Sequence, residues 1–187
     1  MTIDIRRSRP EDHAAILSLM DKARGVGLSD EERARRGFVQ GNLTGELLNR
    51  FQDGPGIFVA DAAGELAGFA ITSEPGWLPP GHPAAAAVAA VTKAADGRDL
   101  GRLFLYGPVA VDDRFQGRGV LTKLLTALSR ALQGDFDLAV AFVETANERS
   151  LAVHRHYEMA EDAHFEAGGR TYVAFTFSPA AFAQGQS

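Results

Sequence analysis

The segment with the clearest chemical potential is a loop with two closely spaced glycines that leads into a leucine-rich stretch. It reads Val109-Ala110-Val111-Asp112-Asp113-Arg114-Phe115-Gln116-Gly117-Arg118-Gly119-Val120-Leu121-Thr122. Amide N–H groups in the first turn of a helix have no internal partner, and the helix dipole makes that end partly positive. A pyrophosphate can dock there if it can approach the backbone closely, which glycines allow. The segment therefore indicates an anion-binding loop, with Arg118 as a nearby cation.

The same loop also has a purely structural interpretation, because two glycines can simply turn the chain into a helix. Neither of the better-known phosphate motifs, Gly-x-Gly-x-x-Gly and Gly-x-x-x-x-Gly-Lys-Ser/Thr, occurs here. Loops of those kinds usually follow an early strand, whereas this one lies past the middle of the chain. On these residues alone, both interpretations stay open.

The segment from Gly107 onwards resembles the coenzyme A loop of the Gcn5-related N-acetyltransferase (GNAT) family. Gly-Pro-Val-Ala-Val precedes the loop, and Gln116 and Gly119 match the first two fixed positions of Gln/Arg-x-x-Gly-x-Gly/Ala. Leu121 departs from the third position, but it still offers the main-chain N–H that such a site uses. The residues that the resemblance assigns to acetyl-CoA are Val109, Ala110, Val111, Gln116, Gly117, Arg118, Gly119, Val120, Leu121, Thr122 and Asn147.

A second block, beginning at Asn147, resembles the helix that follows the family's next strand. The family shows a small residue three positions after this asparagine and a Tyr or His seven positions after it. Here those positions hold Ser150 and His154. The family then usually shows Gly-Phe, where this chain has Glu158-Met159. The order and spacing of the elements match over nearly the whole chain.

The resemblance implies that a primary amine attacks the acetyl thioester directly while both substrates are bound. An amine with a pKa of about 10 needs a base, and a leaving thiolate with a pKa of about 8.5 needs a proton donor. Glu144 is the first candidate base, with a solvated strand-end carboxylate as the competing interpretation. His154 is the candidate acid by position, and Tyr157, near the same helix face, is the runner-up. The Val109 amide would meet the oxyanion; Tyr106 could face the thioester or be a core aromatic.

Hydrophobic periodicity indicates the elements that position these residues. Strands are expected at 3–6, 56–61, 65–71, 103–111, 138–143 and 170–177. Helices are expected after Ser8 as N-cap, over 29–36, after Thr44, over 121–132 and over 150–159. A breaker cluster at 75–81 and an alanine-rich helix form an expected insertion near the acceptor side.

These elements and the resemblance predict one α/β domain over residues 1–187 with a GNAT-like fold. Its mixed, mostly antiparallel sheet of about seven strands would carry helices on both faces. Gly107-Pro108 should mark a bulge or the end of strand pairing, because proline cannot donate to the ladder. Coenzyme A would enter the opening between the strands at that point.

Composition narrows the function classes further. The chain has no cysteine, which excludes an acyl group carried on an enzyme thiol and a thiolate zinc site. The net charge of −5 disfavours nucleic acid as a partner. No apolar run approaches the roughly 20 residues of a membrane span, and the N-terminus lacks a signal-peptide core. We expect a cytoplasmic protein with no membrane partner. His154 and Glu158 have the spacing of a metal pair but no third ligand, so no metal is expected.

The sequence leaves the acceptor open between a small-molecule and a peptide amine. The run Arg33, Arg35 and Arg36 is either a solvated helix face or, since the resemblance places the acceptor near the early helices, a site for a carboxylate-bearing acceptor. A homodimer is an expectation from the resemblance only. Two other functions remain: a catalytically weak coenzyme A-binding regulatory or interaction domain, and a plain structural α/β domain.

Overall fold

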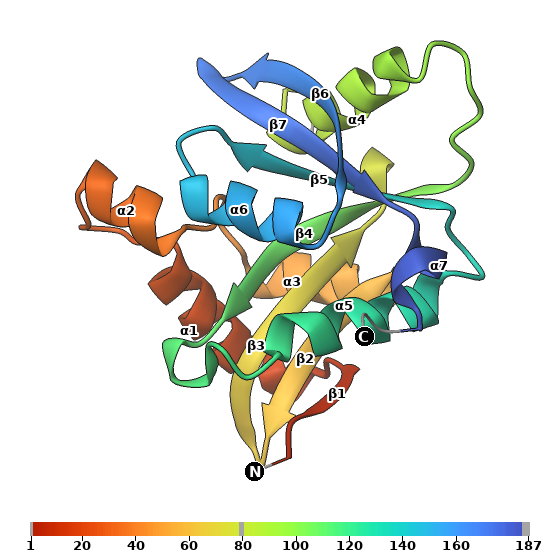
Figure 1. Cartoon of the computed structure of the whole chain (residues 1–187). Helices are drawn as coiled ribbons and strands as arrows, with labels where there is room; N and C mark the ends of the chain where they lie inside the picture. The colour runs from red at the N-terminus through yellow and green to blue at the C-terminus, as the bar shows by residue number, and fades with distance from the viewer. Residues whose placement is uncertain (1, 79–80, 185–187) are drawn as a thin grey trace.

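A computed structural model describes residues 2–78 and 81–184, so that Pro79 and Pro80 of the expected breaker cluster lie outside the described residues. Seven strands form one sheet in the order β1-β2-β3-β4-β5-β7-β6 (Figure 1). They are β1 (Asp4–Arg7), β2 (Gly56–Ala62), β3 (Glu65–Ser73), β4 (Leu103–Val111), β5 (Leu138–Glu144), β6 (Ala160–Ala167) and β7 (Arg170–Phe177). Only the pairing of β4 with β5 is parallel. The mixed, mostly antiparallel sheet predicted from the sequence is confirmed.

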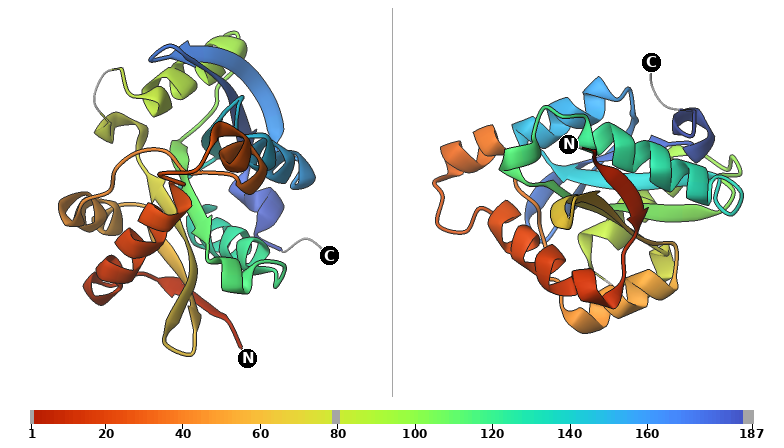
Figure 2. Two further views of the ribbon diagram at one scale, coloured as in Figure 1. Left: turned by 90° about the vertical axis from the view of Figure 1, so that its left-hand side faces the viewer. Right: turned by 90° about the horizontal axis from the view of Figure 1, so that it is seen from below.

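Helices cover both faces of this sheet. They are α1 (His13–Ala23), α2 (Asp30–Arg36), α3 (Gly45–Asp53), α4 (Pro83–Ala94), α5 (Val120–Leu132), α6 (Glu148–His156) and α7 (Pro179–Phe182). The cores under them place α5, α6 and α7 on one face and α1, α3 and α4 on the other. Seen from below, α1 and α3 lie on one side of the strands and α5 on the opposite side (Figure 2). The result is a three-layer arrangement, with α2 beside α6 at one end.

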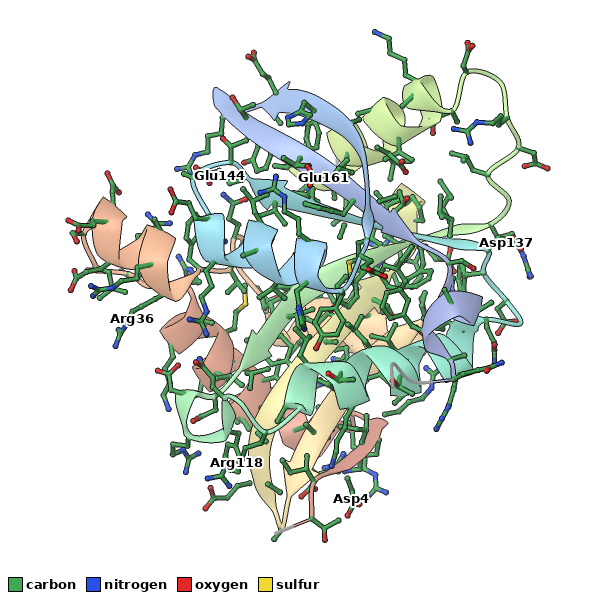
Figure 3. All side chains as sticks on the ribbon, in the orientation of Figure 1. Asp4, Arg36, Arg118, Asp137, Glu144 and Glu161 are labelled. Carbon is green, nitrogen blue, oxygen red and sulfur yellow. The ribbon has the colours of Figure 1, made fainter. Side chains whose placement is uncertain are left out.

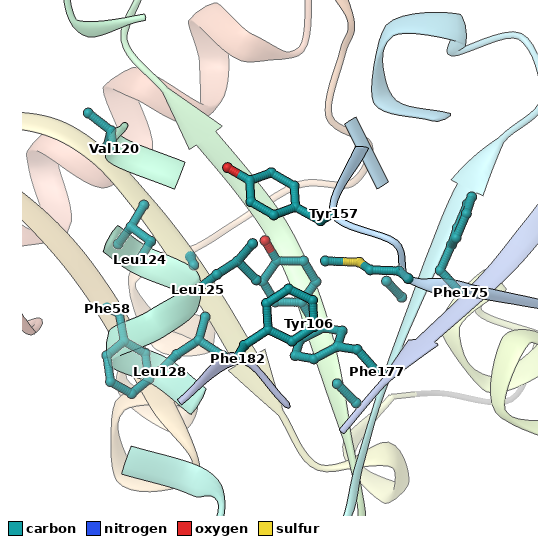
Figure 4. Close-up of a cluster of buried hydrophobic side chains, with 14 of the residues drawn as sticks. Phe58, Tyr106, Val120, Leu124, Leu125, Leu128, Tyr157, Phe175, Phe177 and Phe182 are labelled. Atoms are coloured by element: carbon teal, nitrogen blue, oxygen red, sulfur yellow. The ribbon is translucent and has the colours of Figure 1, made fainter. Parts of the chain in front are cut away.

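The two faces are built by the alternation of side chains along the strands, which β2 shows clearly. In β2, Ile57 and Val59 pack under α1 and α3, whereas Phe58 and Ala60 point to the α5 side. Full burial of a large apolar side chain contributes about 1.5–3 kcal/mol. The leucine stripe of α5 faces this second core, where Leu124, Leu125, Leu128 and Leu132 are buried (Figure 4). The expected amphipathic helix is therefore confirmed.

The start of α1 differs from the expectation that Ser8 caps it. A short 3-10 turn (Pro10–Asp12) precedes α1, and the Asp12 carboxylate accepts the Arg9 amide at 2.7 Å. The Ser8 hydroxyl instead accepts a hydrogen bond from the side chain of Gln52 in α3. The Ser8 prediction is wrong because the turn begins at Pro10, which puts Arg9 rather than Ser8 at the N-cap position. At α2 the expected helix start is confirmed, and Ser29 caps the helix by accepting the Glu32 amide.

The chain after α6 was only partly anticipated. The helix expected over 150–159 ends at His156, and the following residues form strand β6, which pairs with β7 at the edge of the sheet. All residues of β6 except Phe165 are polar or small, so the segment gives no clear apolar alternation. A strand that faces solvent on its outer edge and much of one face does not need that pattern.

Strand pairing is shortest in the middle of the sheet, between β4 and β5. β4 and β5 pair only through Leu103–Leu105 and Leu138–Val140, and no pairing follows beyond Leu105. On its other edge, β4 has a register shift against β3 between Ala70 and Thr72. Both irregularities lie next to Gly107-Pro108, as the proline predicts. We call the unpaired stretch between β4 and β5 the seam. No helix in the described ranges is both long and apolar enough to cross a membrane.

Candidate functional site

The two loop glycines are required by the backbone. Gly117 and Gly119 both have φ of 71°, a left-handed conformation that side chains disfavour. A Cβ built on either glycine would have no other atom within 4 Å, so the space beside both is open. Gly119 is the N-cap of α5, and no side chain caps this helix. The start of α5 is therefore accessible to a ligand.

The amides of this loop are available for a ligand. Lys123 is the first residue in which the amide closes a helical hydrogen bond, to the Gly119 carbonyl at 3.0 Å. Within the described ranges, no backbone or side-chain acceptor meets the N–H groups of residues 117–122. Several donors thus converge at a positive helix end, which is the physical requirement for binding a diphosphate.

The side chains of the loop leave these amides uncovered. Leu121, the departure from the family pattern, packs its side chain against the α5 core. Arg118 is exposed, with its guanidinium 5.6 Å from the centroid of the Phe115 ring. Gln116 donates to Asp113 and accepts from Arg149 of α6 at 3.1 Å, so its side chain bridges the two sides of the seam.

Strand β4 turns part of its backbone toward the seam. The Asp112 amide donates to the Ala67 carbonyl at 2.9 Å on the β3 side. Because donors alternate along an antiparallel strand, the amides of Val111 and Val109 face away from β3 and that of Ala110 faces toward it. Of the three β4 residues expected to contact the cofactor, Val109 and Val111 thus offer free-edge amides, and Ala110 does not.

His154 is held in a neutral, well-defined state. Its Nδ1 lies 2.7 Å from the Ser150 carbonyl, which can only accept, so Nδ1 carries the proton and Nε2 is left as an acceptor. Burial lowers the pKa of His154 below its ordinary value, although the Ser150 bond opposes this. The ring packs 4.9 Å from that of Phe175. A neutral His154 with Nδ1 engaged does not fit the expected role of proton donor.

Tyr157 is better placed to carry a proton. Its hydroxyl lies 2.7 Å from Oγ1 of Thr122, in the first turn of α5, and the side chain is otherwise buried. Tyr106 lies beside it between α5 and Phe175 (Figure 4). Burial strongly raises the pKa of Tyr106, which supports its interpretation as a core aromatic. The structure thus brings Tyr157 and Thr122 together at the start of α5.

Asn147 has a structural role in this fold. Its Oδ1 accepts the Ser150 amide at 3.3 Å and caps α6, and its Nδ2 donates to the Phe38 carbonyl at 2.6 Å. The side chain is only 4% exposed. Both polar atoms are therefore occupied within the protein, and they connect the start of α6 to the segment between α2 and α3.

Glu144 lies on the other face of β5 from the helix α6 residues. Val143 points to the α5 and α6 core, so the next side chain along the strand points to the opposite face. There the Glu144 carboxylate accepts from Arg170 at 2.8 Å and from the side chain of Gln40. Figure 3 shows Glu144 far along the sheet from Arg118 of the loop. The candidate base and the candidate donor thus approach β5 from opposite faces.

A pocket of about 540 Å³ opens beside Glu144. It is lined by residues 24–28, Arg33, residues 39–42, Arg170 and Tyr172. Gln40 and Arg170, the two partners of Glu144, are both in this wall. The described residues of the segment 75–100, expected near the acceptor side, are absent from the pocket lining, and α4 packs on β5–β7. Of these wall residues, the sequence had singled out Arg33 as a candidate for the acceptor site, but it gave no indication of Arg24, Gln40 or Arg170.

The unusual pair Glu158-Met159 fits the turn after α6. Glu158 has φ of 53°, a conformation that glycine adopts most easily, and Met159 is buried in the α5 core. The chain therefore keeps the backbone shape and the apolar anchor that Gly-Phe would supply. Over the described ranges, no group of three His, Cys, Asp or Glu residues is arranged to hold a metal ion.

The sequence has one clear match among protein families. Residues 28–159 match the model of the Acetyltransferase (GNAT) family, a span that includes the loop, Glu144, Asn147, His154 and Tyr157. A search of curated proteins finds no match.

Solved structures share the fold over nearly the full length. Ard1 from Thermoplasma volcanium has 15% identity and a TM-score of 0.65, with 95% of this chain and 98% of that chain covered. A ribosomal-protein-alanine N-acetyltransferase from Brucella melitensis has 19% identity and a TM-score of 0.61, covering 94% and 99%. YncA from Salmonella typhimurium, solved with its cofactor acetyl-CoA, has 17% identity and a TM-score of 0.62, covering 96% and 95%.

Proposed function

The chain belongs to the acetyltransferase (GNAT) family, and from this premise we propose that it transfers an acetyl group from acetyl-CoA to a primary amine. The observation that supports this most directly is the run of unpartnered amides over residues 117–122 at the start of α5. A diphosphate is the ligand chemistry that such a helix end binds. Acetyl-CoA carries this group and supplies the activated acetyl thioester.

The residues at the seam fit this cosubstrate. The open space beside Gly117 and Gly119 allows the diphosphate to reach the backbone, and exposed Arg118 adds a positive charge. The free-edge amides of Val109 and Val111 can bind polar groups that lie along the seam. Of these, the Val109 amide is the one we assign to the developing oxyanion, because it directly follows Pro108 in the part of β4 that no longer pairs with β5.

Two side chains, one on each face of β5, carry out the two proton transfers of the reaction. On the pocket face, Glu144 takes the proton of the acceptor amine at its carboxylate, directly or through water. On the α6 face, Tyr157 gives a proton from its hydroxyl to the leaving sulfur, with Thr122 orienting that hydroxyl. This arrangement suits direct attack, in which the amine approaches the carbonyl carbon from one face of the thioester plane and the sulfur then leaves from the tetrahedral intermediate, so that the base and the proton donor act from different directions. His154 packs behind Tyr106 and helps to fix this side of the seam.

The test of the cofactor assignment is calorimetric titration with acetyl-CoA and with acetylpantetheine, which carries the thioester without the diphosphate. We expect acetyl-CoA to bind at least about a hundredfold more tightly, since charge-assisted bonds to several amides are lost with the shorter compound. Equal affinities would refute the placement of the diphosphate at α5.

Transfer itself is tested by mass spectrometry after incubation with acetyl-CoA and a panel of primary amines. An acetylated product is expected. Tight binding of acetyl-CoA without any product would favour the coenzyme A-binding regulatory domain instead.

A further inference from the structure

The pocket beside Glu144 has an unusual charge distribution. Three arginines from separate elements reach it: Arg24 at the end of α1, Arg33 in α2 and Arg170 at the start of β7. No Asp or Glu is part of the lining. The remaining wall includes the apolar residues Val26, Leu28 and Val39. A cavity with cationic and apolar walls favours an anionic ligand that also carries an apolar part.

Two of the three arginines already have acidic partners. Arg170 bonds to Glu144 at 2.8 Å, and Arg24 lies 3.6 Å from Asp21. Arg33 differs, because no acidic side chain in the described ranges pairs with it. Its Nε is buried without a hydrogen-bond partner, and its guanidinium lies 4.3 Å from the ring centroid of Phe38. Arg33 is therefore a positioned cation with unused donors in the pocket wall.

The buried Nε of Arg33 carries a desolvation cost that its surroundings do not offset. A buried N–H without a partner loses its hydration and gains nothing in return. Stacking on Phe38 fixes the plane of the guanidinium and leaves its edge free for in-plane bonds. Carboxylate and phosphate are the groups that match this planar fork, and both bind in a bidentate manner.

We propose that the acceptor is a small amine that carries a carboxylate, as a free amino acid does, and that Arg33 binds this carboxylate. The proposal rests on the proposed function and names its substrate class. A volume of about 540 Å³ lies within the roughly 300–1,000 Å³ of small-molecule sites. Glu144 is hydrogen-bonded to the wall residues Gln40 and Arg170, so the proposed base borders the pocket that would receive the amine end of the same molecule.

Hydrogen bonds connect the pocket wall that contains Arg33 to β5 and to the start of α6. The Asn147 side chain bonds to the carbonyl of Phe38, and Phe38 supports the Arg33 guanidinium. Gln40, two residues later, bonds to Glu144. The carboxylate-binding arginine and the candidate base are thus joined through one short segment, which fixes the distance between the two ends of the acceptor.

The experiment compares L-leucine, L-methionine and L-phenylalanine with their amides, which keep the amine but lack the carboxylate. With the full-length protein and acetyl-CoA, we expect at least one acid to be acetylated, with a KM about tenfold or more below that of its amide. Arg33→Gln should raise the KM of the acid about tenfold and leave that of the amide within about twofold. Arg36→Gln is the matched control: Arg36 is exposed on the same helix (Figure 3). The pocket wall does not include it among the described residues.

A second measurement is independent of turnover. N-acetyl-L-leucine and N-acetyl-L-leucinamide are titrated calorimetrically into wild-type protein and the two variants, after their melting temperatures confirm folding. Tighter binding of the acid that is lost in Arg33→Gln alone supports the proposal. Amides that bind and react as well as the acids overturn it. If acetyl-CoA fails to bind while the acid binds through Arg33, the proposed function fails and the carboxylate site stands.

Discussion

The hydroxyl of Tyr157 lies 2.7 Å from Oγ1 of Thr122, and this hydrogen bond joins the end of α6 to the first turn of α5. The two helices follow β5 and β4, the strands that diverge at the seam. The bond therefore connects the two sides of the seam at the start of α5. A proton held by Tyr157 lies next to the main-chain donors assigned to the cofactor.

Tyr157→Phe tests the donor role. It removes the hydroxyl but keeps the buried ring, so we expect kcat to fall about a hundredfold while the Kd of acetyl-CoA changes less than about threefold. Thr122→Val, which removes only the partner of Tyr157, should have a smaller effect on kcat. A kcat near that of the wild type in Tyr157→Phe would assign the proton to solvent.

Gly119→Glu tests the diphosphate site. The substitution adds bulk and a negative charge at the N-cap of α5, so the Kd of acetyl-CoA should rise about a hundredfold or more. Gly64→Glu is the control for backbone strain, since Gly64 has φ of 90° and equally open surroundings in the β2–β3 turn. Calorimetry should find cofactor binding intact in Gly64→Glu. Equal affinities in both variants would contradict the site.

His154 predicts a pH dependence of stability. Burial lowers its pKa in the folded protein, so the unfolded chain takes up a proton as the pH falls through 6.5 while the folded protein does not. The contribution of neutral His154 to the free energy of unfolding is therefore fully present above about pH 6.5. It is lost as the pH falls toward the pKa of His154 in the folded protein. His154→Gln should reduce the difference in Tm between about pH 7.5 and about pH 5.5. Burial lowers the pKa of His82 too, so His82→Gln should act in the same direction. An unchanged difference in His154→Gln would mean that the ring is protonated when folded.

Glu158 predicts a stabilising substitution. A left-handed conformation costs a non-glycine residue about 1–2 kcal/mol, and glycine loses about 0.5–1 kcal/mol of that gain through its greater unfolded-state freedom. Glu158→Gly should therefore stabilise the fold by about 0.5–1 kcal/mol and raise Tm by a few degrees. Glu158→Gln keeps the strained backbone and removes only the charge. A rise in Tm of the same size in both variants would assign the effect to charge.

Asn147→Asp separates the capping of α6 by this residue from its hydrogen bond to the Phe38 carbonyl. The aspartate still accepts the Ser150 amide, but it places an oxygen against the Phe38 carbonyl and removes a bond of 2.6 Å. We expect a loss of about 1–3 kcal/mol in stability and a higher KM for the acceptor, with the Kd of acetyl-CoA little changed. A comparable rise in that Kd would instead support a direct contact of Asn147 with the cofactor.

The local features of this fold were readable from the sequence because local patterns carry them. The leucines of α5, the Ser29 cap and the interruption at Gly107-Pro108 each depend on neighbours within a few positions. The Ser8 prediction failed because the turn begins at Pro10, so that Arg9 is the N-cap and its amide donates to the Asp12 carboxylate. Strand β6 was missed because an exposed edge strand does not need apolar alternation.

The site was less predictable because it depends on contacts between distant segments. Gln40 meets Glu144, and Asn147 meets Phe38, across more than a hundred positions of sequence. No spacing rule indicates such pairs in a single sequence. The family motif placed His154 at the donor position, but its bond to Ser150 and its burial, which favour the neutral ring, appear only in three dimensions.

The short pairing between β4 and β5 influences which substitutions the protein can accept during evolution. Beyond Leu105 the exposed edge of β4 presents peptide groups, and every residue except proline supplies the same N–H and C=O whatever its side chain. Recognition through such groups tolerates replacement of the side chains around it. A surface of this kind can keep one cosubstrate while the opposite wall, built from side chains such as Arg33, diverges to select a new acceptor.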